Sequence, residues 1–428
     1  MNRVSKIFKV DDITSFKKKL FNWSNNFEVS VYLDSNNYKS KIEDYETILC
    51  VDIHSKLPYT KEKSLDKLDN YINQTKDWIF GYFSYDLKNE IEDLKSDNID
   101  KFDIPNIFFF QPKKIWLISN SSIEALYLDG NQIQDDWIEI NSINSSLNFT
   151  NSNKIQLKER LNKEQYKDKI KKLLDHIKRG DIYEANYCME WFSENSKIVP
   201  NEVYLRLNEI SKTPMSAYFK NQNFHLLSSS PERYIKREND RIVSQPIKGT
   251  SRRDSDDFID MKLMKELHIN PKERSENIMI VDLIRNDLSK FSIAGSVEVK
   301  ELCKVYSFKQ VHQMISTIES KVKHDLTCVE IIKSTFPMGS MTGAPKIRAL
   351  EIIEDLEVST RGLYSGALGY IKPSGDFDFN VIIRSLIYDS VTNYLSFHVG
   401  SAITSKSDVF KEYEECLLKA KAMISVLQ

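Results

Sequence analysis

The sequence predicts an α+β fold, in which short strands and amphipathic helices mix along the whole chain. Runs rich in β-branched and aromatic residues are typical of strands, and four of them lie at 29–33, 78–85, 107–110 and 115–118. Apolar residues at helical spacing predict a helix over 163–179, with Gly180 at its C-terminal end. A last helix is predicted from near Asp408 to the C-terminus.

The composition allows a large hydrophobic core. Of the 428 residues, 41% are hydrophobic and 11% aromatic, so one large domain or two ordinary domains can form and extensive disorder is excluded. The 60 basic and 62 acidic residues leave a net charge of −2, which argues against a nucleic-acid or membrane-surface partner. No apolar run reaches the roughly 18 residues of a membrane span, and no signal-peptide core is present.

Cysteine and glycine usage adds two further expectations. The five cysteines are widely spaced without a CxxC pair, which predicts a cytoplasmic protein with no disulfide framework and no zinc site. Glycine is scarce, and nine of the 12 glycines follow residue 248, inside the short strings described below. The polar stretch 141–153 predicts a linker between an N-terminal segment, 1–145, and a second segment, 160–428.

Two groups of glutamates have the spacing of one helix face. Glu273 and Glu276 lie within PKERSENIMIVDLIRNDLSK, and Glu412, Glu415 and Lys419 lie in the last predicted helix. Carboxylates without His or Cys suit a hard cation such as Mg²⁺. A solvated helix face with a Glu415–Lys419 pair explains the same spacing, so the pattern alone leaves both interpretations open.

Two other strings each place one reactive side chain beside turn residues. In SSSPERY, Glu232 follows a strand-like run, and a carboxyl group shielded from water there acts as a general acid. In QPIKGTSRR, Pro246 and Gly249 predict a tight turn at Lys248, which becomes a nucleophile if burial removes its proton. A turn glutamate and a surface lysine are the alternatives when each string is taken by itself.

The remaining strings predict anion binding. Small residues at Thr342, Gly343 and Ala344 precede Pro345 at the predicted start of a helix, where free N–H groups bind a carboxylate and Lys346 adds charge. The spacing is not that of a Walker A loop. Arg384 lies in an apolar strand-like run, FNVIIRSL, and therefore needs an anionic partner.

Taken in order, SPER, PIKGT, IVDLIRND, GSMTGAPK, IIR and EYEE resemble the motifs of the chorismate-utilising enzymes. This family includes the large subunits of anthranilate synthase and aminodeoxychorismate synthase, and the isochorismate and salicylate synthases. The resemblance is strong over about 160–428 and weaker in the N-terminal third. It implies a large α+β fold of stacked mixed β-sheets flanked by helices, with both segments fused into one compact unit.

The resemblance also implies roles for individual residues. Mg²⁺ would bridge the ring carboxylate of chorismate to the glutamates, and Glu232 would be the general acid. The metal ligands would be Glu273, Glu276, Glu412 and Glu415, and the substrate-binding residues would be Thr342, Gly343, Ala344, Tyr364, Arg384, His312, Gly400 and Lys419.

Lys248 distinguishes between branches of the family. PIKGT resembles the aminodeoxychorismate synthases, in which a lysine attacks C2 of chorismate before ammonia attacks C4, whereas anthranilate synthases carry alanine there (PIAGT). The isochorismate and salicylate enzymes activate water with a lysine near the position of Glu184, and a carboxylate there argues against that chemistry. An anthranilate synthase with an atypical lysine remains the alternative.

The same resemblance implies a partner. No glutaminase motif is present, so a separate glutamine amidotransferase subunit would supply the ammonia, and the product would serve p-aminobenzoate and folate synthesis. A non-catalytic paralogue is the third interpretation, and the joint presence of Glu232, Lys248, Glu276 and Glu415 argues against it.

Overall fold

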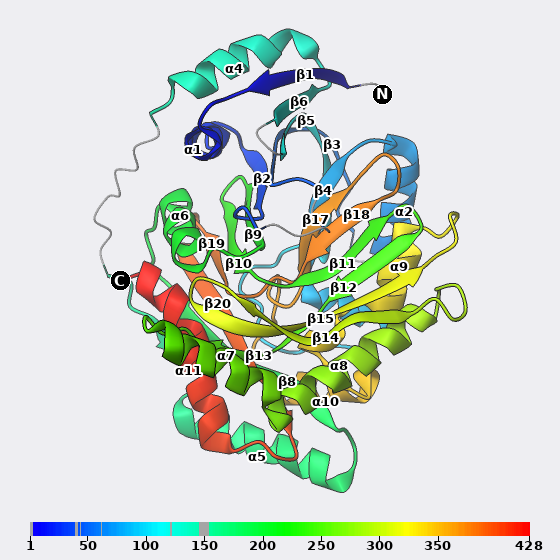
Figure 1. Cartoon of the computed structure of the whole chain (residues 1–428), viewed down its shortest axis with the longest axis vertical. Helices are drawn as coiled ribbons and strands as arrows, with labels where there is room; N and C mark the ends of the chain where they lie inside the picture. The colour runs from blue at the N-terminus through cyan, green and yellow to red at the C-terminus, as the bar shows by residue number, and fades with distance from the viewer. Residues whose placement is uncertain (1–2, 39–41, 43, 61, 120–121, 145–153) are drawn as a thin grey trace.

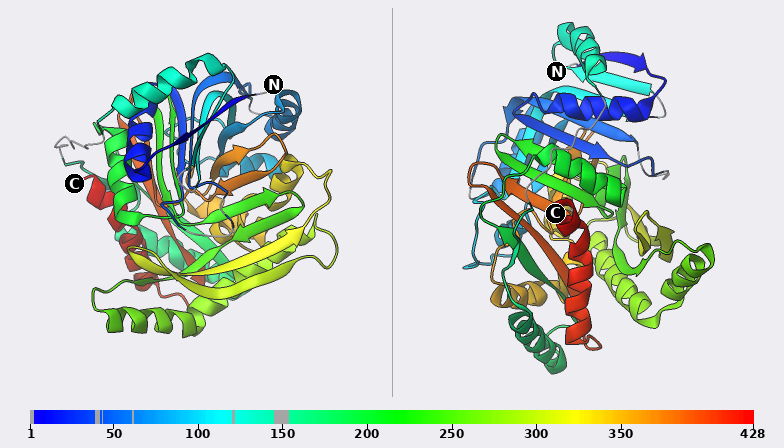
Figure 2. Two further views of the ribbon diagram at one scale, coloured as in Figure 1. Left: turned by 45° about the horizontal axis from the view of Figure 1, so that its top comes forward. Right: turned by 90° about the vertical axis from the view of Figure 1, so that its left-hand side faces the viewer.

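In the computed structural model, a sheet of antiparallel strands folds back on itself into two walls that share the long strand β5, Ile107–Ser119 (Figure 1). The structure describes residues 3–38, 42, 44–60, 62–119, 122–144 and 154–428. Figure 2 shows the strands of the two walls running in different directions, with helices on their outer sides.

The first wall continues from one edge of β5. Its strands follow the spatial order β3 (Thr47–Lys56), β2 (Val29–Asp34), β9 (Met215–Asn221), β10 (Phe224–Ser230), β19 (Ser385–Asp389), β20 (Tyr394–Thr404) and β8 (Glu184–Ser193). The free edge of β8 pairs with the short strands β7 (Lys158–Glu159) and β16 (Gly343–Ala344).

The second wall continues from the other edge of β5. Its order is β4 (Ile79–Phe83), β17 (Ala367–Ile371), β18 (Phe377–Asn380), β11 (Arg233–Glu238), β12 (Arg241–Gln245), β15 (Val311–Lys321) and β14 (Glu298–Ser307). Strand β13 (Ile247–Arg252) follows β12 along the same edge of β15, and β6 (Ser122–Tyr127) with β1 (Val4–Lys9) extends the far end of β5.

Helices cover the outer faces of these walls. The longer ones are α1 (Ile13–Ser24), α2 (Ser64–Thr75), α4 (Ile133–Ser142), α5 (Lys163–Arg179), α6 (Pro200–Ser211), α7 (Asp257–Ile269), α8 (Pro271–Ser289), α9 (Cys328–Thr335), α10 (Lys346–Leu356) and α11 (Val409–Val426). The short α3 spans Lys88–Ile91, and 3₁₀ turns lie at Tyr85–Leu87, Gly130–Gln132 and Gly339–Met341. None of the helices in the described ranges is long and apolar enough to cross a membrane.

The hydrophobic core between the walls is built from the inward side chains of both. Phe80 and Phe108 from the β4 side pack in one cluster with Val31, Phe219 and Leu226 from the other wall. Two larger clusters lie under the helices on the outer faces. Because burial of this apolar surface holds the walls together, the polar side chains at their open end have fixed positions.

The α+β prediction is confirmed, with one correction to the sheets. Every ladder between the strands named above is antiparallel, so the sheets are not mixed. The reason is local: many consecutive strands, such as β9 and β10 or β11 and β12, are joined by short hairpins, which reverse the chain direction.

Two boundary predictions need correction or limitation. The runs 107–110 and 115–118 form one strand, because Pro112 lies at a register shift opposite Ile53, where a missing N–H is tolerated. The predicted linker lies for the most part in 145–153, outside the described residues, and its first two residues end α4. Strands of both segments pair directly, for example β2 with β9 and β4 with β17.

The two predicted helices are confirmed with their ends. Asn162 and Gln165 form a reciprocal capping box at the start of α5, and Gly180 ends the helix with a φ of +84°. Asp408 accepts hydrogen bonds from the N–H groups of Phe410 and Lys411 at the start of α11.

Candidate active site

An ion pair joins the two walls at their open end. Nζ of Lys248, on β13, lies 2.9 Å from Oε1 of Glu184, on β8. Only 10% of the lysine side chain and 1% of the glutamate side chain are exposed. The other oxygen of Glu184 is buried without a hydrogen-bond partner, so this carboxylate can accept a further hydrogen bond.

The backbone at Lys248 differs from the predicted tight turn. Lys248 lies within a strand, at an irregularity in the pairing of β13 with β15 between Ile247 and Thr250. Gly249 has a φ of +93°, a conformation that glycine adopts without strain. The Pro–Ile–Lys–Gly string therefore encodes a bulged strand rather than a turn, and bulges commonly redirect a side chain at a functional site.

The charge of Lys248 also differs from expectation. Burial lowers the pKa of Lys248, but the Glu184 carboxylate and the charge of Glu276 together outweigh burial, and the net shift is upward. Burial alone therefore does not leave a neutral amine here. The ammonium must pass a proton to an acceptor before it can act as a nucleophile, and Glu184 is the acceptor already hydrogen-bonded to it.

Glu232 lies between β10 and β11 and is 3% exposed. Burial raises its pKa to about 7, although hydrogen bonds from Ser340 and the backbone of Ile247 and the nearby charges of Lys248 and Arg384 oppose the shift. A carboxyl group with this pKa carries its proton over part of the neutral range. It therefore has the properties of a general acid, as the sequence predicts.

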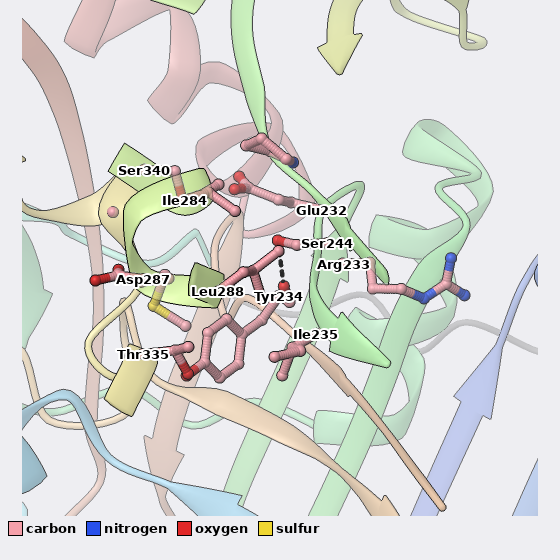
Figure 3. A pocket seen from close by; sticks show the side chains of 13 residues that line it. Glu232, Arg233, Tyr234, Ile235, Ser244, Ile284, Asp287, Leu288, Thr335 and Ser340 are labelled. Carbon is pink, nitrogen blue, oxygen red and sulfur yellow. Dashed lines mark hydrogen bonds between the residues drawn. The ribbon is translucent and has the colours of Figure 1, made fainter. Parts of the chain in front are cut away.

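Glu232 lines a small cavity (Figure 3). Glu232 and Ser340 lie near one another at one end, whereas Arg233 points away and bonds to Asp378 at 2.9 Å. The hydroxyl of Tyr234 lies 2.6 Å from Oγ1 of Thr335 at the other end. The wall is completed by Ile235, Ser244, Pro246, Ile284, Asp287, Leu288, Met338 and Gly339.

Arg384 is close enough to Glu232 for the charge of each to shift the pKa of the other. It lies just before β19 rather than within a strand, and its φ is +50°. Burial lowers its pKa to about 10, and the opposing influence comes from Glu232. None of the ion pairs formed by the described residues includes Arg384. A buried guanidinium of this kind can still bind an anionic ligand.

The predicted carboxylate-binding residues form a loop that backbone hydrogen bonds hold at β8. The N–H of Asn186 donates to the carbonyl of Thr342, and the N–H of Tyr183 donates to the carbonyl of Ala344, each at 2.7 Å. A Cβ on Gly343 would lie 2.1 Å from the carbonyl oxygen of Glu184, so only glycine allows this approach.

Two details of the following helix differ from the sequence prediction. Helix α10 begins at Lys346, so Pro345 precedes its first residue instead of lying in the first turn. The Nζ of Lys346 lies 2.6 Å from Asp287 and does not contribute charge to the loop. The sequence predicts that Lys346 adds charge to the loop because the two are adjacent in the chain. In the structure, the buried Asp287 on α8 determines the direction of the lysine side chain.

The four predicted metal ligands lie on two helices, Glu273 and Glu276 on α8 and Glu412 and Glu415 on α11. Lys272 lies between them, with its Nζ 3.7 Å from Glu276 and 3.4 Å from Glu412. Burial raises the pKa of Glu276 to about 7. The charges of Lys248 and Lys272 lower this pKa, but they do not cancel the effect of burial and of the neighbouring carboxylates.

The donor set fits a hard divalent cation, but only as an open site. Oε1 of Glu276 and Oε2 of Glu412 are buried and accept no hydrogen bond. Within the described part of the chain, no three acidic, His or Cys side chains converge closely enough to enclose a metal. Mg²⁺ usually binds through one or two carboxylates and completes its shell with water and substrate oxygens, which suits this geometry.

The remaining predicted residues fall into two groups. Lys419 joins the acidic helix to the sheet, because its Nζ lies 2.8 Å from both Glu415 and the carbonyl of Gly400. His312 and Tyr364 already contact other side chains. Both ring nitrogens of His312 have partners, Ser307 at 2.8 Å and Asp260 at 3.0 Å, and Tyr364 is buried against the ring of His398.

Three residues of the site escaped the sequence-based assignment of roles. In the sequence analysis, Glu184 is only a carboxylate that argues against water activation. No role is assigned there to Lys272 or Ser340. Lys272 lies next to Glu273, and Ser340 lies inside the glycine-containing string before Thr342. The positions of Lys272 and Ser340 within the motifs could have identified them as residues of the site. No local sequence pattern identifies Glu184 as the partner of Lys248.

Comparison with known proteins identifies the family of the chain. A family model described as chorismate binding enzyme matches residues 25–425. The anthranilate synthase component I-like protein of Synechocystis sp. is 33% identical over 82% of this chain and 72% of its own length. Aminodeoxychorismate synthase component 1 of Escherichia coli K12 is 31% identical over 81% of this chain and 76% of its own length.

Solved structures extend the similarity to the fold. Anthranilate synthase component I of Streptococcus pneumoniae superposes with a TM-score of 0.78 at 22% identity, covering 91% of this chain and 94% of that chain. The menaquinone-specific isochorismate synthase of Escherichia coli superposes with a TM-score of 0.79 at 17% identity, covering 100% of this chain and 94% of that chain.

Proposed function

Because this chain belongs to the family of chorismate-binding enzymes, we propose that it replaces the C4 hydroxyl of chorismate with ammonia and forms 4-amino-4-deoxychorismate. The observation that carries the proposal is that a buried lysine and a buried acid lie near one another. Lys248 and Glu232 are desolvated and lie close enough for the charge of Lys248 to lower the pKa of Glu232. An addition of ammonia at C2 needs no protein nucleophile.

The first half of the reaction uses both residues. Lys248 transfers a proton to Glu184, and its free amine attacks C2 of chorismate. Both ring double bonds shift, C1=C2 to C1=C6 and C5=C6 to C4=C5, as the C4–O bond breaks, and protonated Glu232 donates its proton so that the hydroxyl leaves as water. The result is a covalent lysine adduct and an ionised Glu232.

The second half reverses the displacement. Ammonia attacks C4, both double bonds shift back, and the C2–N bond to Lys248 breaks. Glu184 returns its proton to the departing lysine amine, and the proton lost by the incoming ammonia passes to Glu232. The enzyme therefore returns to its starting protonation state, and the net change is exchange of water for ammonia at C4.

The other groups of the site would bind Mg²⁺ and the carboxylates of chorismate. Mg²⁺, held by Glu276 and Glu415 with Glu273 and Glu412 directly or through water, would neutralise the ring carboxylate of chorismate. Thr342, Gly343 and Ala344 would receive a substrate carboxylate, and Arg384 would bind the enolpyruvyl carboxylate with help from Tyr364. The place of His312 against the ring and the role of Gly400 stay predictions.

The proposal includes a partner. A glutamine amidotransferase subunit would supply ammonia, and the product would serve p-aminobenzoate and folate synthesis. The relatives named component 1 are consistent with a second component. A cytoplasmic location stays a prediction.

Anthranilate synthase activity is the second candidate, and the relatives favour it in one respect. The Synechocystis protein is named for that enzyme, and so is an Aquifex aeolicus protein that is 27% identical over 91% of this chain. A product assay separates the two. The purified chain is incubated with chorismate, Mg²⁺ and excess ammonium near pH 7, where Glu232 is still partly protonated, with or without aminodeoxychorismate lyase. p-Aminobenzoate that appears only with the lyase supports C4 amination, whereas anthranilate without the lyase refutes it.

A further inference from the structure

Arg361 is a buried arginine with no role in the chemistry described above. It lies between α10 and β17 and is 2% exposed. Its guanidinium pairs with Glu357 through two bonds, Nε to Oε2 at 2.9 Å and Nη2 to Oε1 at 2.7 Å. The ring of Tyr85 packs against it, with the Cζ atom 4.3 Å from the ring centroid.

The remaining donors of this guanidinium reach two carbonyl groups beside the site. Nη1 donates to the carbonyl of Met341 at 2.8 Å, and Nη2 donates to the carbonyl of Asn186 at 2.8 Å. Met341 directly precedes Thr342, and Asn186 is two residues from Glu184 on β8. One side chain therefore bonds to both the substrate-binding loop and the strand against which that loop lies.

Backbone bonds complete the connection. The same Asn186 that accepts from Arg361 donates its N–H to the carbonyl of Thr342, at 2.7 Å. Glu357 Oε1 also accepts the N–H of Cys188, at 2.8 Å, so the acidic partner of Arg361 is bonded to β8 as well. The loop, β8 and the segment after α10 thus form one hydrogen-bonded unit with Arg361 at its centre.

We propose that Arg361 is a positioning residue for substrate binding, which holds the loop Met341–Ala344 against β8 and thereby presets its groups for a carboxylate of chorismate. The inference rests on the assignment of this loop to substrate binding under the proposed function. The planar fork is essential to the role, because it bonds to a carboxylate and two carbonyls at once, which a lysine ammonium cannot do in the same directions.

The expected signature is an effect on affinity rather than on the chemical step. A carboxylate that does not react is bound equally in the ground state and the transition state, so a displaced loop raises KM and leaves kcat nearly unchanged. A defect of folding would instead lower the amount of active enzyme and reduce kcat at constant KM.

The test is the kinetics of Arg361→Lys, measured as chorismate consumption with ammonium and Mg²⁺. We expect KM for chorismate to rise at least tenfold while kcat falls less than threefold. The matched control is Arg237→Lys. Arg237 is also buried, and its guanidinium donates to backbone carbonyls outside the substrate-binding loop, those of Asn239, His324 and Leu326. This control should leave KM within twofold of the parent value.

A second variant covers the case in which Arg361→Lys does not fold. Glu357→Gln keeps the shape of the partner but removes its charge, and we expect a folded protein, by circular dichroism, with KM raised at least threefold. An unchanged KM in either folded variant overturns the inference. Chorismate consumption is measured whichever product forms. Formation of anthranilate would therefore refute the proposed C4 amination, and KM would still decide the role of Arg361.

Discussion

Lys248 and Glu184 stand on opposite walls of the folded sheet and meet at 2.9 Å. Sixty-four residues separate them in the chain, and both side chains are withdrawn from water. Because the carboxylate raises the pKa of the lysine, Lys248 rests in its ammonium form. Under the proposed function, the same contact would supply the acceptor for the proton that must leave before the lysine attacks.

Removal of the nucleophile should separate C4 chemistry from the rest of the site. In Lys248→Ala, we expect C4 amination to fall to the detection limit of the lyase-coupled assay, and some ortho product to form because ammonia can still reach C2. The control is Lys88→Ala, since Lys88 is also a buried lysine paired with a glutamate, 2.7 Å away, outside the site. Unchanged C4 amination in Lys248→Ala would exclude the nucleophile role.

The acid role of Glu232 predicts a pH limit. Its pKa is raised to about 7, so the protonated form needed to donate to the leaving hydroxyl is present below pH 7 and is lost as pH rises through 7. We expect a descending limb of kcat/KM near pH 7 and a loss of roughly 10²–10⁴-fold in Glu232→Gln. A variant with parental rate and an unaltered limb would contradict the assignment.

The glutamates of α8 and α11 predict dependence on a divalent cation. EDTA should abolish activity, and Mg²⁺ should restore it. Glu276→Gln and Glu415→Gln should each raise the Mg²⁺ concentration needed for half-maximal activity by about tenfold or more, the usual scale for metal-site changes. Glu414→Gln is the matched control, because Glu414 lies on the same helix with 65% of its side chain exposed. An equal response of Glu415→Gln and Glu414→Gln would remove Glu415 from the ligand set.

The ion pair between the walls should also contribute to stability. Removing one member of a buried pair leaves an uncompensated charge, which typically costs about 3–5 kcal/mol. We expect Glu184→Ala to lower the free energy of unfolding by about 3 kcal/mol or more, and the double variant Glu184→Ala/Lys248→Ala to recover part of that loss. Urea unfolding of the four proteins of the cycle measures the coupling, and strictly additive losses would show that the pair is not coupled.

Gly343 offers a steric test of the loop. A Cβ there would lie 2.1 Å from the carbonyl oxygen of Glu184, so Gly343→Ala should push the loop away from β8 and raise KM for chorismate at least tenfold. Gly180→Ala is the control. It meets no atom within 4 Å, and its φ of +84° predicts a stability cost of about 1 kcal/mol without a change in KM. A parental KM in folded Gly343→Ala would contradict the assigned position of the loop.

Much of the fold followed from local patterns. Apolar spacing and Gly180 predicted the helix over 163–179, and the last helix was predicted to begin near Asp408, because helix signals are contained within a few turns. Strand pairing was less predictable. The two runs on either side of Pro112 read as separate strands, and only the register shift opposite Ile53 explains how one strand accommodates a proline.

The sequence by itself determined which reactive side chains are present and the order of their motifs, and from these Glu232, Lys248 and the glutamate pairs were identified as candidates. The tertiary structure alone decided their partners: Glu184 for Lys248, Asp287 for Lys346, and Asp260 and Ser307 for His312. The physical reason is that a side chain's type and helical spacing are local properties. Its desolvation and the charges around it depend on strands and helices brought together from distant parts of the chain.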